Sequence, residues 1–186
     1  LVIFPDNHDM DRFYRQVKED LDLFKMGIAY MLTMRGIPQI QYGTEILMSN
    51  AKAHDHGQIR EDFPGGWADD NSNAFTGQNL PKLKAQAQEF TKKLLNWRKN
   101  NPVIHTGKLM QYAPVHDGTY TYFRYNDQES VMVVFNKNEE TAKIDTDHFY
   151  ERIHGYTIGK DILTEKEYAL DQLSVPARSV LIMELK

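Results

Sequence analysis

The chain opens with Leu1-Val2-Ile3-Phe4-Pro5-Asp6-Asn7-His8-Asp9, in which a short apolar run leads into a cluster of polar side chains. The apolar run from Leu1 to Phe4 predicts the end of a buried strand. Asp, Asn and His side chains at the carboxyl end of a strand are typical of the catalytic face of an α/β barrel. A polar turn that only closes the strand is the alternative interpretation of the same residues.

The residues after this cluster predict a helix and then a second short strand. Apolar side chains recur every three or four positions in residues 20–35, which predicts an amphipathic helix. Gly36 and Pro38 end this helix, and residues 37–42 predict another buried strand. Residues 45–79 show little periodicity and many Gly, Asn, Asp and His, so we expect a long functional loop there.

A second helix is predicted after this loop. Asn79 and Pro81 are its start signals, and Asn100-Asn101-Pro102 ends it. Its apolar residues are spaced by three and four positions, and we expect them to pack in a core: Leu80, Leu83, Ala87, Phe90, Leu94 and Trp97.

From Val103 onward, short β-rich segments alternate with turn residues, which predicts an antiparallel β-sandwich. Asp117-Gly118 is a hairpin signal before the first segment. The expected strands cover residues 119–125, 131–135, 141–144, 156–163, 167–170 and 180–185.

Two motifs occur in a fixed order along the chain. Phe4-Pro5-Asp6-Asn7-His8-Asp9 is followed, after one predicted helix, by Gly36-Ile37-Pro38-Gln39-Ile40-Gln41-Tyr42-Gly43-Thr44-Glu45. This pair resembles the α-amylase family of glycoside hydrolases (family 13). In that family F-x-x-N-H-D follows the seventh barrel strand and G-x-P-x-I-x-Y-G-x-E covers the eighth. More loosely, Arg60-Glu61-Asp62-Phe63-Pro64-Gly65-Gly66-Trp67 is similar to the loop after strand eight in the neopullulanase and cyclomaltodextrinase branch.

The resemblance implies an α/β fold followed by an all-β fold. Residues 1–102 would form the last two βα units of a catalytic (β/α)8 TIM barrel, and residues 103–186 a C-terminal antiparallel β-sandwich domain. The family's nucleophilic Asp and acid Glu follow strands four and five, which precede these motifs. We therefore expect this chain to be the back end of a larger protein and to be inactive alone.

Asp9 is the residue that the resemblance places in catalysis, as a third carboxylate that holds sugar hydroxyls near the transition state. His8 would donate a hydrogen bond to a sugar hydroxyl. Asn7 belongs to the same substrate-binding group, although bonding of the loop backbone is its favoured role. A local turn contact is the alternative for the His8-Asp9 pair.

Further substrate-binding candidates lie in the same motifs. Arg60 and Asp62 would pair with each other or contact sugar, and Trp67 would either stack on a glucose ring or pack. Arg12 is near enough to Asp9 to flank the same cleft, with solvent exposure as its favoured state. Glu45 is interpreted as a structural carboxylate.

We expect neither a metal nor a cofactor. His54-Asp55-His56 has no evident third ligand, and Asp69-Asp70-Asn71-Ser72-Asn73 lacks the order of a calcium loop. A solvated loop is the favoured interpretation of each stretch.

Composition narrows the range of partners. The 186 residues are 41% hydrophobic, with a formal net charge of −4, which argues against nucleic acid as the main partner. No apolar run approaches the length of a membrane span. The absence of cysteine excludes disulfides and thiolate chemistry. Periplasmic, secreted and cytoplasmic locations all stay open.

The favoured function is part of a retaining α-glucan hydrolase. Its partner would be an α-glucan oligosaccharide, cut at α-1,4-glucosidic bonds in maltodextrin-, cyclodextrin- or pullulan-like substrates. Transglycosylation by the same carboxylates stays open, as does a homodimer. The alternative from another class is a non-catalytic glucan-binding or interaction protein derived from an amylase-like fold.

Overall fold

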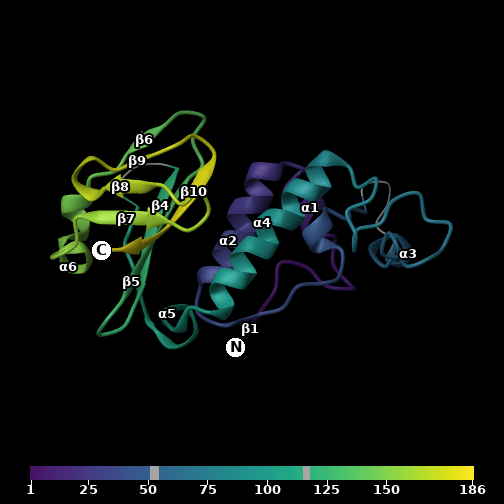
Figure 1. Cartoon of the computed structure of the whole chain (residues 1–186), viewed down its shortest axis with the longest axis horizontal. Helices are drawn as coiled ribbons and strands as arrows, with labels where there is room; N and C mark the ends of the chain where they lie inside the picture. Colours follow the sequence, from purple (N-terminus) through teal and green to yellow (C-terminus); the bar gives the residue numbers. More distant parts are fainter. Residues whose placement is uncertain (51–54, 115–117) are drawn as a thin grey trace. The chain divides into compact units, whose positions relative to one another are not determined.

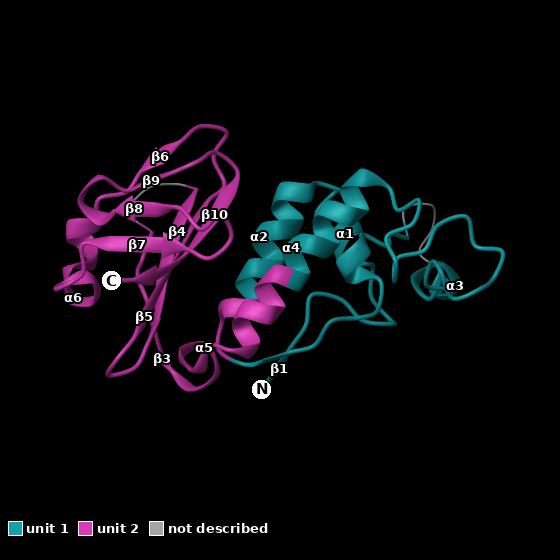
Figure 2. Ribbon diagram, in the orientation of Figure 1, with its two compact units in different colours: residues 1–31, 36–92 teal, residues 32–35, 93–186 magenta. Residues whose placement is uncertain are grey.

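The computed structural model describes residues 1–50, 55–114 and 118–186 and divides into two compact units (Figure 2). Unit 1 comprises residues 1–31 and 36–92, and unit 2 comprises residues 32–35 and 93–186. The helices α2 (Leu21–Thr33) and α4 (Lys82–Lys99) begin in unit 1 and end in unit 2. Asp117 of the hairpin signal lies outside the described residues.

Unit 1 opens with two parallel strands that α2 connects; Figure 1 labels the first of them, β1, beside the N-terminus, and α2. β1 (Val2–Ile3) pairs with β2 (Ile37–Pro38), which confirms the predicted order of strand, helix and strand. The predicted burial is wrong, because Val2 is 49% exposed and Ile37 is 66% exposed. Among the described residues no further strand flanks this pair, so its apolar side chains stay in contact with solvent.

The predicted amphipathic helix is α2, and Asp20 caps it. The Asp20 carboxylate accepts hydrogen bonds from the amides of Asp22 and Leu23, both at 3.0 Å. Gly27 lies against the ring of Phe13 from α1 (Phe13–Gln16), where an added Cβ would stand 2.3 Å from a ring carbon. Of the five apolar side chains at this spacing, Leu21 is only partly buried, and the other four are buried as predicted, namely Phe24, Ile28, Met31 and Leu32.

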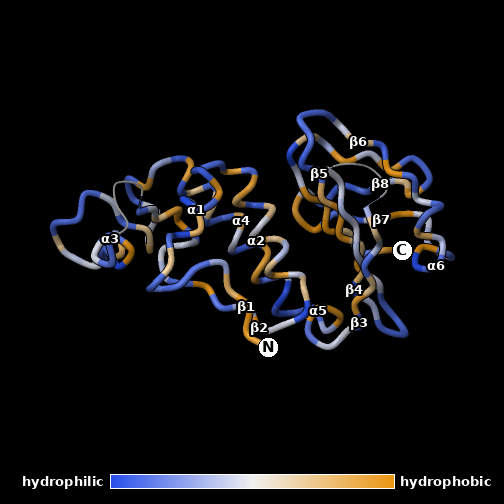
Figure 3. The backbone as a smooth tube through the Cα atoms, turned by 180° about the vertical axis from the view of Figure 1, so that it is seen from behind, coloured by the Kyte–Doolittle hydropathy of each residue, from blue (hydrophilic) through white to orange (hydrophobic). Residues whose placement is uncertain are grey.

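The predicted long loop is confirmed. Within the described part of residues 45–79, regular structure is confined to η1 (Thr44–Ile46) and α3 (His56–Ile59). Figure 3 shows mainly hydrophilic residues along this segment. The loop nevertheless has a small core of its own, made by Ile46, Met48 and Ala74 with Phe63 and Leu80 packed against it. This core gives the loop a defined conformation.

α4 follows the loop and buries Ala87 and Leu94 as predicted, whereas Leu83 is 52% exposed and does not join a core. In unit 1, Lys25 of α2 lies over the ring of Phe90 of α4, 6.0 Å from its centre. Asn101 and Pro102 end α4 as predicted and also start α5 (Pro102–Thr106), which was not expected. Asn101 caps α5 by accepting the amide of Ile104 at 3.2 Å.

Unit 2 is built on an antiparallel sheet, six-stranded within the described residues, in the order β3-β4-β5-β10-β7-β8. Its strands are β3 (Lys108–Gln111), β4 (Thr119–Tyr125), β5 (Ser130–Asn136), β10 (Ser179–Leu185), β7 (Ile158–Asp161) and β8 (Glu167–Ala169). β6 (Ala142–Lys143) and β9 (Ser174–Val175) form a smaller antiparallel sheet. The strand predictions are confirmed, but β3 and β9 were not expected.

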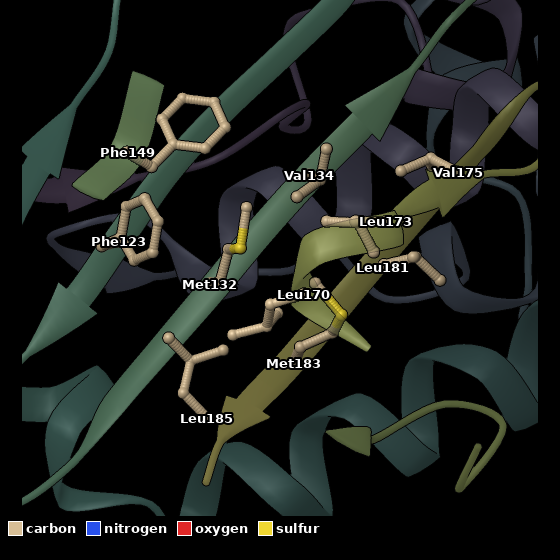
Figure 4. Packing of buried hydrophobic residues seen from close by; sticks show 10 residues of the cluster. All are labelled: Phe123, Met132, Val134, Phe149, Leu170, Leu173, Val175, Leu181, Met183 and Leu185. Atoms are coloured by element: carbon tan, nitrogen blue, oxygen red, sulfur yellow. The ribbon is translucent and has the colours of Figure 1, made fainter. Parts of the chain in front are cut away.

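One face of the larger sheet carries the main core of unit 2 (Figure 4). Side chains from β4, β5 and β10 meet residues of β9 and of the short helices η2 (Thr146–Phe149), α6 (Tyr150–Ile153) and η3 (Leu170–Gln172). The buried members are Phe123, Met132, Val134, Phe149, Leu170, Leu173, Val175, Leu181, Met183 and Leu185.

The other face of this sheet is covered by the helix ends that belong to unit 2. The hydroxyl of Tyr122 lies 2.5 Å from that of Thr33, and Arg124 donates to the carbonyl of Thr33 at 2.9 Å. The indole of Trp97 donates to Glu184 at 2.8 Å. Because both faces are covered, every residue of β5 is buried. Among the described helices, none combines the length and apolar character needed to cross a bilayer.

Candidate functional site

Asp9 stands in a tight turn after β1. Its amide donates to the side-chain oxygen of Asn7 at 2.8 Å, so Asn7 bonds the loop backbone as predicted. His8 Nε2 lies 3.1 Å from Asp9 Oδ2. The side chains of His8 and Asp9 are 63% and 59% exposed, which leaves both accessible to a ligand.

The long loop brings Arg60 onto this turn. Arg60 Nη2 donates to Asp9 Oδ1 at 2.9 Å, and its Nε donates to the carbonyl of His8 at 3.1 Å. These residues are 51 positions apart in the sequence, so only the folded loop creates the contact. Of the two expected roles, pairing of Arg60 with Asp62 is not seen among the described residues, because Arg60 pairs with Asp9, and contact with sugar stays a prediction.

His56, at the start of α3, is a further residue at Asp9. Its Nδ1 lies 3.7 Å from Asp9 Oδ1. The sequence suggested His56 only as a weak metal ligand beside His54, which lies outside the described residues. No group of three potential metal-ligating side chains occurs in the described ranges.

The contacts around Asp9 fix a carboxylate without burying it. His8 approaches one oxygen, while Arg60 and His56 approach the other. A carboxylate offers about four lone-pair sites, so acceptor capacity is left for hydroxyl groups of a ligand. The arrangement suits a rigid anion that accepts hydrogen bonds from a polyhydroxylated substrate.

Arg12 does not lie in solvent, and that prediction is wrong. The residue is fully buried, and its guanidinium donates to the carbonyls of Tyr42 and Ile59, the latter at 3.4 Å. Burial lowers the pKa of Arg12, and the negative charge of Asp6 opposes this effect. These contacts join the segment after β2 to the end of α3. A role of Arg12 in substrate binding stays a prediction. Its contacts favour a structural role, in which it holds these two segments together.

Asp6 is a residue that the sequence analysis did not single out within the first motif. Its carboxylate accepts hydrogen bonds from the Phe13 amide at 2.8 Å and from the Thr44 hydroxyl at 3.0 Å. Arg12 Nε lies 3.9 Å away. Burial raises the pKa of Asp6, against the effect of these partners. Burial likewise raises the pKa of Glu45, which η1 carries.

Trp67 and Asp62 form a second group in the loop. The Trp67 indole donates to Asp62 Oδ2 at 3.2 Å, although its ring is 64% exposed. Asp70 accepts the amides of Gly65 and Trp67 at 2.7 and 3.1 Å. The sequence predicted Trp67 as either a stacking or a packing residue, and the ring is not packed away.

Comparison with known proteins finds relatives of this chain. Residues 109–184 match the model of the cyclo-malto-dextrinase C-terminal domain. Over 147 residues the chain is 33% identical to the cyclomaltodextrin glucanotransferase of Thermoanaerobacterium thermosulfurigenes. That alignment covers 76% of this chain and 17% of the relative, so the chain spans less than a fifth of that relative's length.

Solved structures share the fold. The α-amylase of Geobacillus thermoleovorans, complexed with acarbose, superposes with a TM-score of 0.74 at 21% identity, covering 100% of this chain and 39% of that one. The cyclomaltodextrin glucanotransferase CldA, with a three-domain ABC distribution, gives a TM-score of 0.62 at 27% identity, covering 99% and 36%. The β-rich part matches the C-terminal β domain of such enzymes. The chain therefore belongs to the α-amylase family of glycoside hydrolases (family 13), in which it corresponds to a C-terminal region.

Proposed function

We propose that this chain supplies the transition-state-stabilising carboxylate of a retaining α-glucan hydrolase. The observation that carries this proposal is the exposed Asp9 carboxylate, held between His8 and Arg60. The nucleophile and the general acid would come from residues outside this chain. The 186 residues alone would therefore bind part of a substrate without cutting it.

The proposed role follows from the chemistry of retaining hydrolysis. One carboxyl group attacks the anomeric carbon and another protonates the leaving oxygen, through an oxocarbenium-like transition state. Asp9 would accept hydrogen bonds from sugar hydroxyls as the ring flattens. Because Arg60 and His8 already fix the carboxylate, little reorganisation is needed at that moment.

The proposed architecture places residues 1–102 in the last two βα units of a (β/α)8 barrel and residues 103–186 in the β-sandwich domain. The parallel pairing of β1 with β2, connected through α2, supports the barrel assignment. The exposed apolar side chains of Val2 and Ile37 support it too, because flanking strands and helices cover such residues in a barrel.

The proposed substrates are maltodextrin-, cyclodextrin- or pullulan-like α-glucans, cut at α-1,4 bonds. A glucanotransferase that passes the sugar to another glucan is the second candidate, and the names of the curated relatives favour it. Chromatography of the products from a maltooligosaccharide distinguishes the two, because transfer yields longer or cyclic glucans and hydrolysis yields only shorter ones. A non-catalytic glucan-binding protein would yield no new products.

The test is replacement of Asp9 by Asn (D9N) in protein that carries the complete catalytic site. We expect the turnover number to fall by at least about a hundredfold, because an amide cannot replace the anion. The thermal midpoint should stay close to that of the wild type. Asp127 in the β4–β5 turn is exposed, and D127N is the matched control. Turnover that survives D9N would contradict the proposal.

A further inference from the structure

Trp67 is exposed, yet hydrogen bonds hold both its indole and its backbone amide. Its indole N–H donates to Asp62 at 3.2 Å and its backbone N–H donates to Asp70 at 3.1 Å. A large apolar ring that is 64% exposed gains little from burial at this position. Asp62 nevertheless holds the indole and Asp70 holds the backbone beside it, so a flat ligand that stacks on the ring meets a side chain already in place.

Trp67 lines a pocket whose other side chains are almost all polar. Trp67 and Ala68 are the apolar side chains of its lining, and carboxylate and carboxamide groups make up much of the rest, namely Asp70, Asn71, Asn73, Gln78 and Asn79. We call this the Trp67 pocket. In the described part of the chain, the Gln78 carboxamide has no hydrogen-bond partner. Its donor and acceptor are therefore available to a ligand.

The backbone around the Trp67 pocket is closed by its own hydrogen bonds. The Asn73 amide donates to the carbonyl of Gln78 at 2.8 Å, and the Ala74 amide donates to that of Pro64 at 3.0 Å. Ala74 is anchored in the small core with Ile46 and Met48. The walls of the pocket are thus held in position without a ligand.

We propose that the Trp67 pocket is a subsite for one glucose unit of an α-glucan, a role that rests on the proposed function. The ring face of Trp67 would stack on the apolar face of the sugar, while Asp70 and Gln78 would bind its hydroxyls. A pyranose presents this combination of a flat apolar face and a polar rim. An apolar peptide would leave the carboxylate and the carboxamides unpaired.

Trp67 lies on the same loop segment as Arg60, which contacts Asp9. The loop that places Arg60 on Asp9 continues through Asp62, which holds the indole of Trp67. The two groups of residues therefore belong to one continuous structural segment. An oligosaccharide of several glucose units is the ligand class that both groups together would bind.

The experiment is calorimetric titration of maltotetraose into the 186-residue chain. We expect Trp67→Ala (W67A) to weaken binding about tenfold, through loss of the stacking surface. Gln78→Ala should also weaken binding, by about threefold, and it leaves both anchors of Trp67 intact. Phe75→Ala is the matched control, since Phe75 is a 73% exposed aromatic residue of the same loop outside the pocket lining.

Three results would overturn the subsite. They are a wild-type chain that does not bind maltotetraose, W67A and Q78A variants that both bind like the wild type, and an F75A variant that loses as much affinity as W67A. If circular dichroism shows that W67A fails to fold, the result for Q78A decides alone.

The D9N variant distinguishes this proposal from the proposed function. Loss of turnover in D9N together with unaltered binding by W67A and Q78A would reject the subsite and keep the proposed function. Turnover that survives D9N together with weakened binding by W67A would do the reverse.

Discussion

The first motif contains one exposed and one buried aspartate, three positions apart. The exposed Asp9 accepts a hydrogen bond from Arg60. Asp6 is buried, where its carboxylate accepts a hydrogen bond from Thr44 and lies near the guanidinium of Arg12. Sequence predicts Asp9 because the motif carries it. The burial of Arg12 could not be predicted, since arginine is mostly exposed and its acceptors at Tyr42 and Ile59 are distant in sequence. The contact of Arg60 with Asp9 escaped prediction for the same reason.

Replacing Arg12 by Met (R12M) should lower the free energy of unfolding by about 3–5 kcal/mol. The change leaves the buried Asp6 carboxylate without its cation, and it removes the donors of the Tyr42 and Ile59 carbonyls. Urea denaturation followed by circular dichroism measures the difference. Arg35 is exposed, and R35M should change the free energy by less than about 0.5 kcal/mol. Equal effects of the two substitutions would contradict the assigned role.

The hydrogen bond from the Trp67 backbone amide to Asp70 should persist until strongly acid conditions. Hydrogen bonds from the amides of Trp67 and Gly65 lower the pKa of Asp70 below its ordinary value of 3.8. A lowered carboxyl pKa means that the contribution is present above 3.8 and is lost as the pH falls through the lowered value. The amide signals of Gly65 and Trp67 in NMR spectra should therefore shift only below pH 3.8. In D70N this shift should disappear, and a transition near neutral pH would be inconsistent with this assignment.

At the scale of elements, regular periodicity predicted the long helices and strands, while some of the shorter elements were missed. α2 and α4 follow from apolar spacing, and β4 and β5 from runs of β-branched and aromatic residues. β9 has two residues and was missed, although the two-residue strands β1, β2 and β6 lie within predicted segments. Asn101-Pro102 predicts a helix end, but the same signals also begin α5, because a cap and a first-turn proline serve a new helix.

The turn before η1 provides a test at this scale. Gly43 has φ +82°, and an added Cβ would lie 2.0 Å from Met48 Sδ and 2.9 Å from Arg12 Nη2. Gly77 has φ +79° but open space around the same position. We expect G43A to lower the free energy of unfolding by at least about 1 kcal/mol more than G77A, because only G43A adds a steric clash to the backbone strain. Urea denaturation of both variants measures the difference, and equal losses would mean that the close packing at Gly43 is unimportant.

At the scale of the whole molecule, the compact units divide the chain within α4, ten residues before the sequence-based boundary at 102. Unit 2 uses the end of α4 to cover one face of its sheet. Trp97 contacts Glu184, and Lys93 donates to the carbonyl of Leu163 at 2.7 Å. The sequence shows that β-rich segments begin after Val103. It does not show that the end of the preceding helix covers one face of their sheet.

A fragment of residues 93–186 should therefore be more stable than a fragment of residues 103–186. The shorter fragment loses the hydrogen bond from Trp97 to Glu184 and that from Lys93 to the carbonyl of Leu163, and we expect its thermal midpoint to be lower by at least about 4–8 °C. Thermal unfolding followed by circular dichroism compares the two. Equal midpoints would show that the end of α4 contributes nothing to the stability of unit 2.

The edges of the larger sheet also affect how the protein behaves at high concentration. β3 and β8 occupy the two ends of the strand order, with four and three residues each. Each edge presents a charged residue, Lys108 on β3 and Glu167 on β8, and both residues are exposed. Short, charged edges are poor templates for a strand from another molecule. The domain is accordingly protected against edge-to-edge pairing with other copies and the fibre growth that would follow.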